Sequence, residues 1–299
     1  MTFIIQKISL LALFVVLLFA CNQEKKESAD TTSTFRLITY NVWYGFTKVP
    51  ERKARWIEWM REQNPDVVSL QELNEYTPEK LAEDASKWGH QYTELLKTDG
   101  FPTGVTSKYP IEDVQRFFEG FHHGLLRVKI QGKYIYIIHL HPSNWETRNR
   151  EIDWIISDVN NLPKGTPVIL AGDFNTFSPD DSIFYSNSHL EPFFDARDKA
   201  YKEVNLRDGR LDYSVIEKLL EYGFTDLENK MRSEDYQFTG SFPTRIEKEG
   251  EHGDQRRLDY IITDGETATT VVHAEIIADD VTLKLSDHLP MIVDFEFVK

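Results

Sequence analysis

The sequence is poor in cysteine and in basic residues. Its single cysteine, Cys21, excludes an intramolecular disulfide. The chain of 299 residues has 34 Lys and Arg against 49 Asp and Glu, which leaves a formal net charge of -15. Such an acidic chain lacks the basic footprint of a dedicated DNA-binding protein. Hydrolysis of nucleic acid stays open, because it needs only a local metal site.

Three common catalytic signatures are also missing. The sequence contains no Gly-rich phosphate loop, no GxSxG nucleophile elbow and no HExxH metal motif. Their absence argues against a P-loop nucleotidase, an α/β-hydrolase and a zincin protease. Catalytic residues therefore have to be sought in other patterns.

Long hydrophobic runs are confined to the N-terminus. The stretch MTFIIQKISLLALFVVLLFAC (1–21) has one charge, Lys7, followed by an uncharged run to Ala20. This pattern is typical of a secretory signal, and its end, LFAC, resembles a bacterial lipobox, whose cysteine is lipidated. We therefore predict a lipoprotein signal peptide over 1–21, membrane attachment through Cys21 and a flexible polar tether over 22–34. The predicted location is the bacterial cell envelope, periplasmic or surface-exposed. An uncleaved anchor and a plain signal peptide are the alternatives.

Residues 35–299 show no repeat, linker or break in composition, and we predict one domain. Apolar periodicity alternates between that of strands and that of helices, which predicts an α/β fold of mixed sheets covered by helices. The expected helices are 50–64, 78–89, 146–162 and 213–224, and segment 178–213 is expected to be polar and irregular. The expected strands are 35–43, 65–72, 104–111, 122–130, 133–141, 167–175, 256–264, 270–277 and 288–298.

Polar side chains recur where these apolar strands end or begin. A buried strand that ends in a carboxylate or an imidazole needs a partner for that group. One such residue is commonly a local cap or a satisfied core histidine, but a whole set is expected to converge on one rim. Phe174, inside the stretch GDFN, is expected to point the other way, into the core. The set comprises Asn41, Glu72, His139, Asp173, Asn175, Asp259, Asp287 and His288.

The residue types of this set favour one chemistry. Several carboxylates and an amide are the hard oxygen donors that suit Mg²⁺ or Mn²⁺. Two histidines beside acids supply a general acid or base and a group that orients it. Together they indicate metal-dependent hydrolysis of a phosphoester.

Six short motifs in a fixed order carry a family resemblance: TYNVW, SLQE, IIHLHP, GDFN, RRLDYI and SDHLP. With this order the chain resembles the endonuclease/exonuclease/phosphatase superfamily, the deoxyribonuclease I-like metal-dependent phosphoesterases, over residues 35–298. The resemblance implies a four-layer αββα sandwich, in which two mixed β-sheets pack face to face with helices outside. It also implies a site at one edge of the sandwich.

The resemblance assigns a metal role to three residues. Glu72 of the QE pair would hold the metal, and Asn41 of the YN pair would lie beside it. Asp287 of SDH would add a carboxylate on the metal side. The implied cofactor is Mg²⁺ or Mn²⁺.

Five further residues are assigned catalytic roles by the same resemblance. Asp173 would orient or deprotonate the attacking water, and Asn175 would contact the scissile phosphate. His288 would face the phosphate and would be oriented by Asp259. His139 would hydrogen-bond a phosphate oxygen or the leaving group.

The predicted function is that of a secreted, lipid-anchored, divalent-metal-dependent phosphodiesterase of the nuclease-like branch, acting as a monomer. Its partner is a phosphoester substrate, and the acidic charge does not favour nucleic acid. Alternatives are a phosphomonoesterase or a head-group phosphodiesterase acting on small, sugar, inositol or lipid phosphates. An inactive lipoprotein that binds phosphorylated ligands is the non-enzyme alternative. Arg148 and Arg150 on the helix after His139 are expected to be solvated, unless one of them reaches the substrate phosphate.

Overall fold

The computed structural model describes residues 32–246, 248 and 250–298. The predicted signal peptide with Cys21, and most of the predicted tether, lie outside the described residues. Strand β1 begins at Thr32, three residues before the predicted start of the domain at 35. Residues 34–297 form one compact unit. Within the described part of the chain, no helix is both long and apolar enough to cross a membrane.

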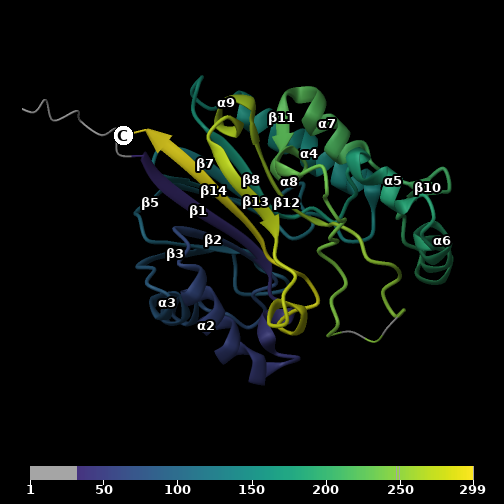
Figure 1. Ribbon diagram of the computed structural model, residues 1–299, viewed down its shortest axis with the longest axis horizontal. Helices are drawn as coiled ribbons and strands as arrows, with labels where there is room; N and C mark the ends of the chain where they lie inside the picture. Colours follow the sequence, from purple (N-terminus) through teal and green to yellow (C-terminus); the bar gives the residue numbers. More distant parts are fainter. Residues whose placement is uncertain (1–31, 247, 249, 299) are drawn as a thin grey trace, which may run out of the picture. The chain divides into compact units, whose positions relative to one another are not determined.

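Two six-stranded sheets build this unit (Figure 1). β1 runs parallel to β2 in the first sheet, and β7 runs parallel to β8 in the second, while most other neighbours are antiparallel. In sheet order, the first comprises β13 (Val271–Ile276), β14 (Met291–Val298), β1 (Thr32–Asn41), β2 (Val67–Gln71), β4 (Gly104–Ser107) and β3 (Tyr92–Leu95). The second comprises β11 (Phe224–Asp226), β12 (Asp259–Asp264), β8 (Val168–Asp173), β7 (Lys133–His139), β6 (Leu125–Ile130) and β5 (Ile111–Phe117).

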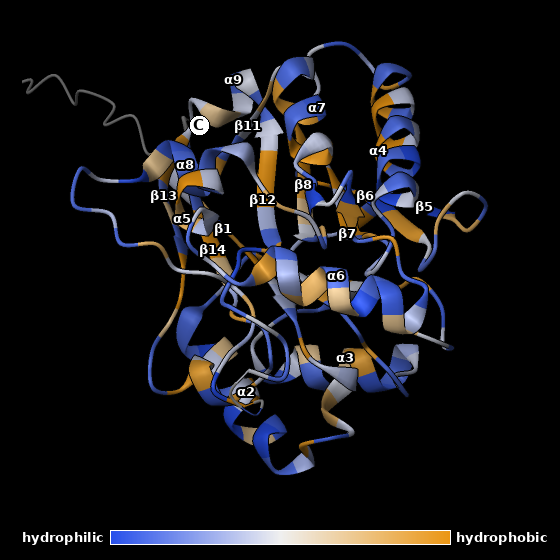
Figure 2. Ribbon diagram, turned by 90° about the vertical axis from the view of Figure 1, so that its right-hand side faces the viewer, coloured by the Kyte–Doolittle hydropathy of each residue, from blue (hydrophilic) through white to orange (hydrophobic). Residues whose placement is uncertain are grey.

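Four layers result from the packing of these sheets. Helices α2 (Lys53–Gln63) and α3 (Pro78–Lys87) cover the outer face of the first sheet. Helices α4 (Trp145–Asn160) and α7 (Ser214–Tyr222) cover the outer face of the second, on the opposite side of the sheets (Figure 2). The inner faces of both sheets share one apolar core, to which Leu37 and Val67 come from the first and Ile137 and Ile261 from the second. The predicted αββα sandwich is therefore confirmed.

Local sequence explains where the covering helices begin and end. Thr77 caps α3 by accepting a hydrogen bond from the backbone N–H of Lys80, and Pro78 follows at the first helical position. Asn144 caps α4 in the same way, through the N–H of Thr147. α7 ends at Gly223, whose φ of 100° favours glycine. The predicted boundaries of these helices are therefore close to the observed ones.

The prediction of an irregular segment over 178–213 is wrong. The structure places α5 (Ser182–Tyr185), α6 (Leu190–Tyr201) and the short strands β9 (Leu206–Arg207) and β10 (Arg210–Leu211) there. Apolar side chains spread thinly through this polar segment gather into a small separate core, and that burial stabilises the helices. The short helices α8 (Leu227–Met231) and α9 (Gly265–Ala268) were also not predicted from the hydrophobic pattern.

The expected strand over 104–111 is in fact divided between the two sheets. β4 ends at Ser107 in the first sheet, and β5 starts at Ile111 in the second. Pro110 precedes the new strand, and proline has no N–H for a sheet ladder and disfavours helical conformation in the residue before it. The chain therefore passes from the first sheet to the second between Ser107 and Ile111. The composition changes little there, so the sequence pattern did not separate the two strands.

Candidate active site

Strand register brings three of the predicted residues into one row. His139 is paired with Asp173 across β7 and β8, and Asp173 is paired with Asp259 across β8 and β12. β12 runs antiparallel to β8, so Asp259 opens its strand at the edge where the other two strands end. Asp259 was expected inside its strand, but its position at the start delivers it to the same rim.

A glycine allows this row to form. The backbone of Gly172 adopts a φ of 154°, and a Cβ atom on it would lie 2.0 Å from the carbonyl oxygen of Ile138 on β7. Only a residue without a side chain permits such a close approach of the two strands. Gly172 therefore sets the position of Asp173, and the next residue, Phe174, is fully buried in the core between β8 and the outer helices, as predicted.

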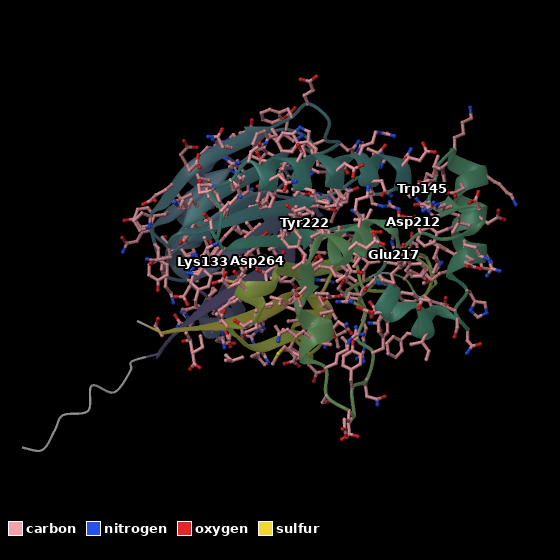
Figure 3. All side chains as sticks on the ribbon, turned by 90° about the horizontal axis from the view of Figure 1, so that it is seen from above. Lys133, Trp145, Asp212, Glu217, Tyr222 and Asp264 are labelled. Atoms are coloured by element: carbon pink, nitrogen blue, oxygen red, sulfur yellow. The ribbon has the colours of Figure 1, made fainter. Side chains whose placement is uncertain are left out.

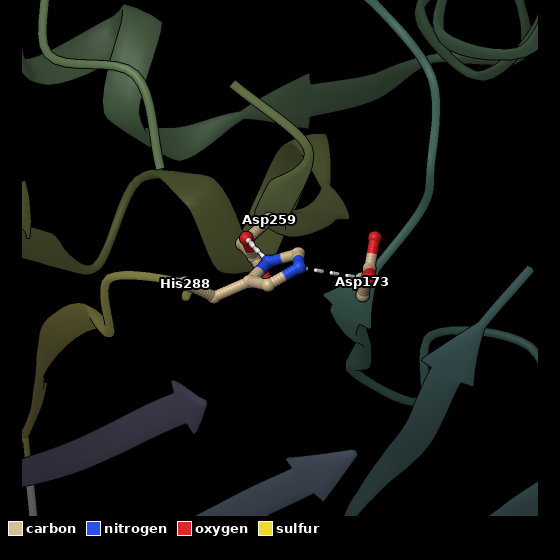
Figure 4. A group of neighbouring side chains, drawn as sticks. All are labelled: Asp173, Asp259 and His288. Carbon is tan, nitrogen blue, oxygen red and sulfur yellow. Dashed lines mark hydrogen bonds and ion pairs between the residues drawn. The ribbon is translucent and has the colours of Figure 1, made fainter. Parts of the chain in front are cut away.

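Asp259 and His288 form a buried acid–imidazole pair (Figure 4). His288 Nδ1 lies 2.7 Å from Asp259 Oδ2. The hydroxyl of Ser241 fixes the start of β12 by accepting hydrogen bonds from the N–H groups of Leu258 and Asp259. Burial by itself would lower the pKa of His288, but the charges of Asp259 and Asp173 outweigh it and raise that pKa to about 10. His288 is therefore an imidazolium at neutral pH.

Asp173 lies at the centre of the site. Its Oδ2 is 3.8 Å from Nε2 of both His139 and His288, which is too long for a hydrogen bond. Asn41 Nδ2 donates to the same oxygen at 3.1 Å, and the N–H of Asn175 donates to Oδ1 at 2.9 Å. Burial raises the pKa of Asp173 above its usual range, although the charge of His288 opposes that shift.

His139 is held in the opposite protonation state from His288. Complete burial lowers the pKa of His139 well below its ordinary value, and neighbouring imidazoles such as His123 add to the effect. Its ring stacks on that of His123 with centroids 4.1 Å apart, and its Nδ1 has no hydrogen-bond partner among the described residues. A neutral and a charged imidazole thus flank one carboxylate, which is an arrangement suited to acid–base work.

Glu72 and Asn41 come from the first sheet. Glu72 follows β2 with a φ of 57°, and its carboxylate accepts from Asn41 Nδ2 at 3.2 Å and from the N–H of Tyr44 at 3.0 Å. The amide oxygen of Asn41 accepts from the N–H of Trp43, so its NH₂ group faces Glu72 and Asp173. Asn41 therefore holds two carboxylates together, and its ligation of a metal stays a prediction.

The donor set fits a hard divalent cation. Glu72, Asp173 and Asp287 present carboxylate oxygens to the same cavity. Asp173, Asp259 and His288 also have donor atoms within 4.8 Å of one another. His288 Nδ1 is already bound to Asp259, so that atom is not free to bind a cation. Glu72 and Asp287 stay the predicted ligands of the cation.

The site opens into a cavity of about 400 Å³. Asn41 and Asp259 are completely buried behind it and support the residues in front. Aromatic side chains form much of its wall: Trp43, Tyr44, Phe101, Phe193, Phe194 and Phe242. The predicted residues that line it are Glu72, His139, Asp173, Asn175, Asp287 and His288. The structure therefore brings together all eight predicted residues, six at the cavity and two directly behind it.

A second cavity, of about 530 Å³, lies at the far ends of α4 and α7 and includes Tyr222 and Asp264 (Figure 3). Asp264 accepts hydrogen bonds there from the N–H groups of Val168 and Thr267, so it serves as a cap. None of the eight predicted residues lines this cavity. The predicted site residues are therefore gathered at the first cavity and not at this one.

Several residues that shape the site escape prediction from sequence. Ser241 and Ser286 act through backbone groups: Ser286 Oγ donates to the carbonyl of Asn41 at 2.7 Å. Arg256 lines the cavity although it was expected to be one of several strand residues. The sequence did contain a signal for Arg256: two adjacent arginines, Arg256 and Arg257, stand at the start of an otherwise apolar strand.

Comparison with known proteins agrees with this geometry. The model of the Endonuclease/Exonuclease/phosphatase family matches residues 38–288. An AP endonuclease from Archaeoglobus fulgidus is 20% identical with a TM-score of 0.62, and the match covers 87% of this chain and 99% of that one. The 3' phosphatase NExo from Neisseria, solved with a product DNA hairpin, is 16% identical with a TM-score of 0.63, covering 88% and 100%. No curated protein sequence matches the chain.

The chain belongs to the Endonuclease/Exonuclease/phosphatase family. It is therefore an enzyme that hydrolyses phosphoesters with a divalent metal, as the motifs indicate.

Proposed function

We propose that this protein is a magnesium-dependent phosphodiesterase of the cell envelope. The observation that carries the proposal is that His288, held by Asp259, meets the carboxylates of Asp173 and Glu72 at one cavity. A positive imidazolium and a group of carboxylates suited to a metal match the two demands of phosphoester hydrolysis, which are charge neutralisation and activation of water.

Each residue has a definite task in this reaction. The imidazolium of His288 donates a hydrogen bond to a phosphate oxygen, and Asp259 fixes its orientation and its charge. Asp173 accepts the proton of the attacking water, which its raised pKa favours. A bound Mg²⁺ would neutralise phosphate charge. The amide of Asn175 and the neutral ring of His139 would orient the phosphate and the leaving group.

The metal side of the proposal is tested at Glu72. Glu72→Gln keeps the shape of the side chain but removes one negative charge, so we expect kcat at low Mg²⁺ to fall by about 100-fold, roughly 2.7 kcal/mol, with partial recovery at high Mg²⁺. Glu75→Gln is the matched control, because Glu75 is exposed and does not line the cavity. Full activity of the Glu72 variant at low Mg²⁺ would contradict the assignment.

Substrate class is tested with a panel of phosphodiesters and phosphomonoesters, each assayed with Mg²⁺, Mn²⁺ and Ca²⁺. We expect diesters to be turned over faster than monoesters, with Mg²⁺ or Mn²⁺ and without effective support from Ca²⁺, whose larger and looser coordination suits the geometry less. A clear preference for monoesters would favour the phosphomonoesterase alternative. The same panel separates both from an inactive phospho-ligand-binding protein, which would turn over none of them.

Lipid anchoring is proposed from the sequence of residues 1–21. We expect the full-length protein to partition into the membrane fraction of a bacterial host, and a form starting at residue 22 to stay in the soluble fraction and remain active. Cys21→Ser should abolish anchoring, because no other thiol is present to accept the lipid. Metabolic labelling with a fatty acid provides the measurement. A serine variant that is labelled like the parent would overturn the proposal.

A further inference from the structure

Two buried arginines beside the catalytic cavity lack a carboxylate partner. Arg148 and Arg256 are 2% and 6% exposed. Among the described residues, neither guanidinium forms an ion pair, and Nε of each has no hydrogen-bond partner. A buried charge without a counter-ion is costly, so the surroundings of these two side chains need an explanation.

Arg256 is held by carbonyl groups and aromatic rings. Its Nη1 donates to the backbone oxygens of His252 at 2.7 Å and Asp254 at 3.1 Å. Its guanidinium carbon lies 4.6 Å from the ring centre of Phe242, 5.2 Å from that of Phe194 and 5.9 Å from that of Phe193. These contacts fix the side chain and stabilise its charge in part, but they supply no negative charge.

Arg148 reaches the same region from the first turn of α4. Its Nη1 donates to the backbone oxygen of His141 at 3.1 Å. Both arginines line a recess of about 30 Å³, together with the amide side chains of Asn175 and Asn205. Asn175, Asn205 and Arg256 also line the main cavity, so the recess is its inner extension.

A neighbouring arginine shows how this chain otherwise treats a buried guanidinium. Arg257 is completely buried and donates to Asp181 at 2.7 Å and to both oxygens of Asp226 at 2.9 and 2.6 Å. Although burial opposes it, these carboxylates raise the pKa of Arg257 well above its ordinary value. Burial instead lowers the pKa of Arg148 and of Arg256 to about 10. More distant carboxylates, such as Asp212 for Arg148 and Asp173 for both arginines, oppose this lowering only in part. Arg257 is thus paired directly with carboxylates, whereas the two arginines at the recess have no direct carboxylate contact among the described residues.

We propose that the recess is an anion subsite, and that the substrate is a small phosphate ester carrying a second anionic group. This inference rests on the proposed phosphoesterase function and names its substrate class. Two guanidinium groups line the recess together with Asn175, which is proposed to contact the reacting phosphate, and Asn205, whose Nδ2 already donates to Asp198 and Glu203. A recess of about 30 Å³ admits the oxygen atoms of a phosphate or carboxylate entering from the main cavity. The aromatic wall of that cavity, which includes Trp43 and Phe242, suits a ring between the two anionic groups.

The test compares ligands that differ by one anionic group. Thymidine 3',5'-bisphosphate, thymidine 5'-monophosphate and a thymidine 5'-phosphate with a 3'-carboxymethyl group are titrated into the metal-free protein by calorimetry. We expect the bisphosphate to bind about 10- to 100-fold more tightly than the monophosphate, the range that one or two charge-assisted hydrogen bonds supply. The carboxymethyl ligand shows whether a carboxylate serves as well as a phosphate. Equal affinity of all three ligands would mean that the recess holds only water, and would overturn the proposal.

Arg256→Gln links the preference to the recess. The ratio of the affinities for the bisphosphate and the monophosphate should fall by most of the 10- to 100-fold preference in this variant. Arg150→Gln is the matched control, because Arg150 lies on the same helix as Arg148 but is exposed and lines neither cavity. An equal loss of affinity for both ligands in Arg256→Gln would overturn the subsite. If circular dichroism shows that Arg256→Gln does not fold, Arg256→Lys is measured instead. An undiminished preference of Arg256→Lys for the bisphosphate over the monophosphate would overturn the proposal, and a several-fold weaker preference would support it.

Turnover measurements distinguish a failure of the anion subsite from a failure of the proposed phosphodiesterase function. The substrates are the 5'-(4-nitrophenyl) phosphodiesters of thymidine with and without a 3'-phosphate. Tight bisphosphate binding without hydrolysis of either diester would reject the proposed function and leave the subsite standing. Hydrolysis of both with equal kcat/KM, and no binding preference, would reject the subsite and leave the function standing.

Discussion

Replacing Asp259 with asparagine should lower kcat by about 100-fold or more, roughly 3 kcal/mol, the scale of losing one preorganised transition-state donor. The amide removes the largest of the charges that raise the pKa of His288 against its burial, and only Asp173 and Asp287 remain to stabilise the imidazolium. It also weakens the 2.7 Å hydrogen bond that orients the ring. The measurement is kcat at saturating substrate and Mg²⁺, with circular dichroism to confirm folding.

A double-mutant cycle shows whether the two residues act together. His288→Ala should cost about as much as Asp259→Asn, and the double variant should cost little more, because residues that act as one unit are not additive. Asp153→Asn is a suitable control, since Asp153 is exposed and, among the residues that the structure describes, pairs only with Lys218. Simple additivity of the two losses would mean that Asp259 is a structural strand residue and that His288 works without it.

The same pair predicts a pH dependence of stability. The pKa of His288 is about 10 in the folded protein, above the ordinary value of 6.5. A raised imidazole pKa contributes stability that is fully present below pH 6.5 and is lost as the pH rises through about 10. We therefore expect the free energy of unfolding of the parent to exceed that of Asp259→Asn most at pH 6 and least near pH 10. A constant difference across this range, measured by urea unfolding, would rule out a charged His288.

Replacing Arg257 with methionine should destabilise the fold by about 3–5 kcal/mol, because removing one partner of a buried ion pair leaves uncompensated charge. Arg257 is the only described cation that bridges Asp181 and Asp226, and Glu228 lies 3.2 Å from it as well. Its loss leaves buried carboxylates facing one another, with Arg232 bound to Asp181 and Glu228 as their remaining cation. Urea unfolding of both proteins gives the difference.

Arg55→Met is the control for this change. Arg55 pairs with Glu58 on the surface of α2, where both side chains are more than 40% exposed, and such solvent-screened pairs contribute little to stability. If Arg257→Met also lowers the free energy of unfolding by less than about 1 kcal/mol, the ion pairs of Arg257 stabilise the fold no more than an apolar side chain does. In that case its role would be to position the start of β12, which should then appear as lower kcat in a stably folded variant.

The sequence by itself determined the chemistry of the site. Asn41, Glu72, Asp173 and Asn175 follow apolar runs, and that pattern is local, because a buried strand that ends in a carboxylate is visible within ten residues. The order of six motifs then indicated the family, which the match over residues 38–288 confirms, and the sandwich, which the two packed six-stranded sheets confirm. The helix expected over 213–224 was equally predictable, since its apolar spacing and the glycine at its end are neighbours in the chain.

Only the tertiary structure decided which histidine is charged and which groups each buried arginine contacts. His139 and His288 look alike in the sequence, yet one is neutral and the other charged, because their burial and nearby charges come from segments far apart in the chain. Arg256 and Arg257 are adjacent, yet Arg257 contacts carboxylates, whereas Arg256 contacts backbone carbonyls and aromatic rings. Successive side chains of a strand point to opposite faces of the sheet. The groups that each side chain meets there come from elements distant in the chain, so they depend on the tertiary packing.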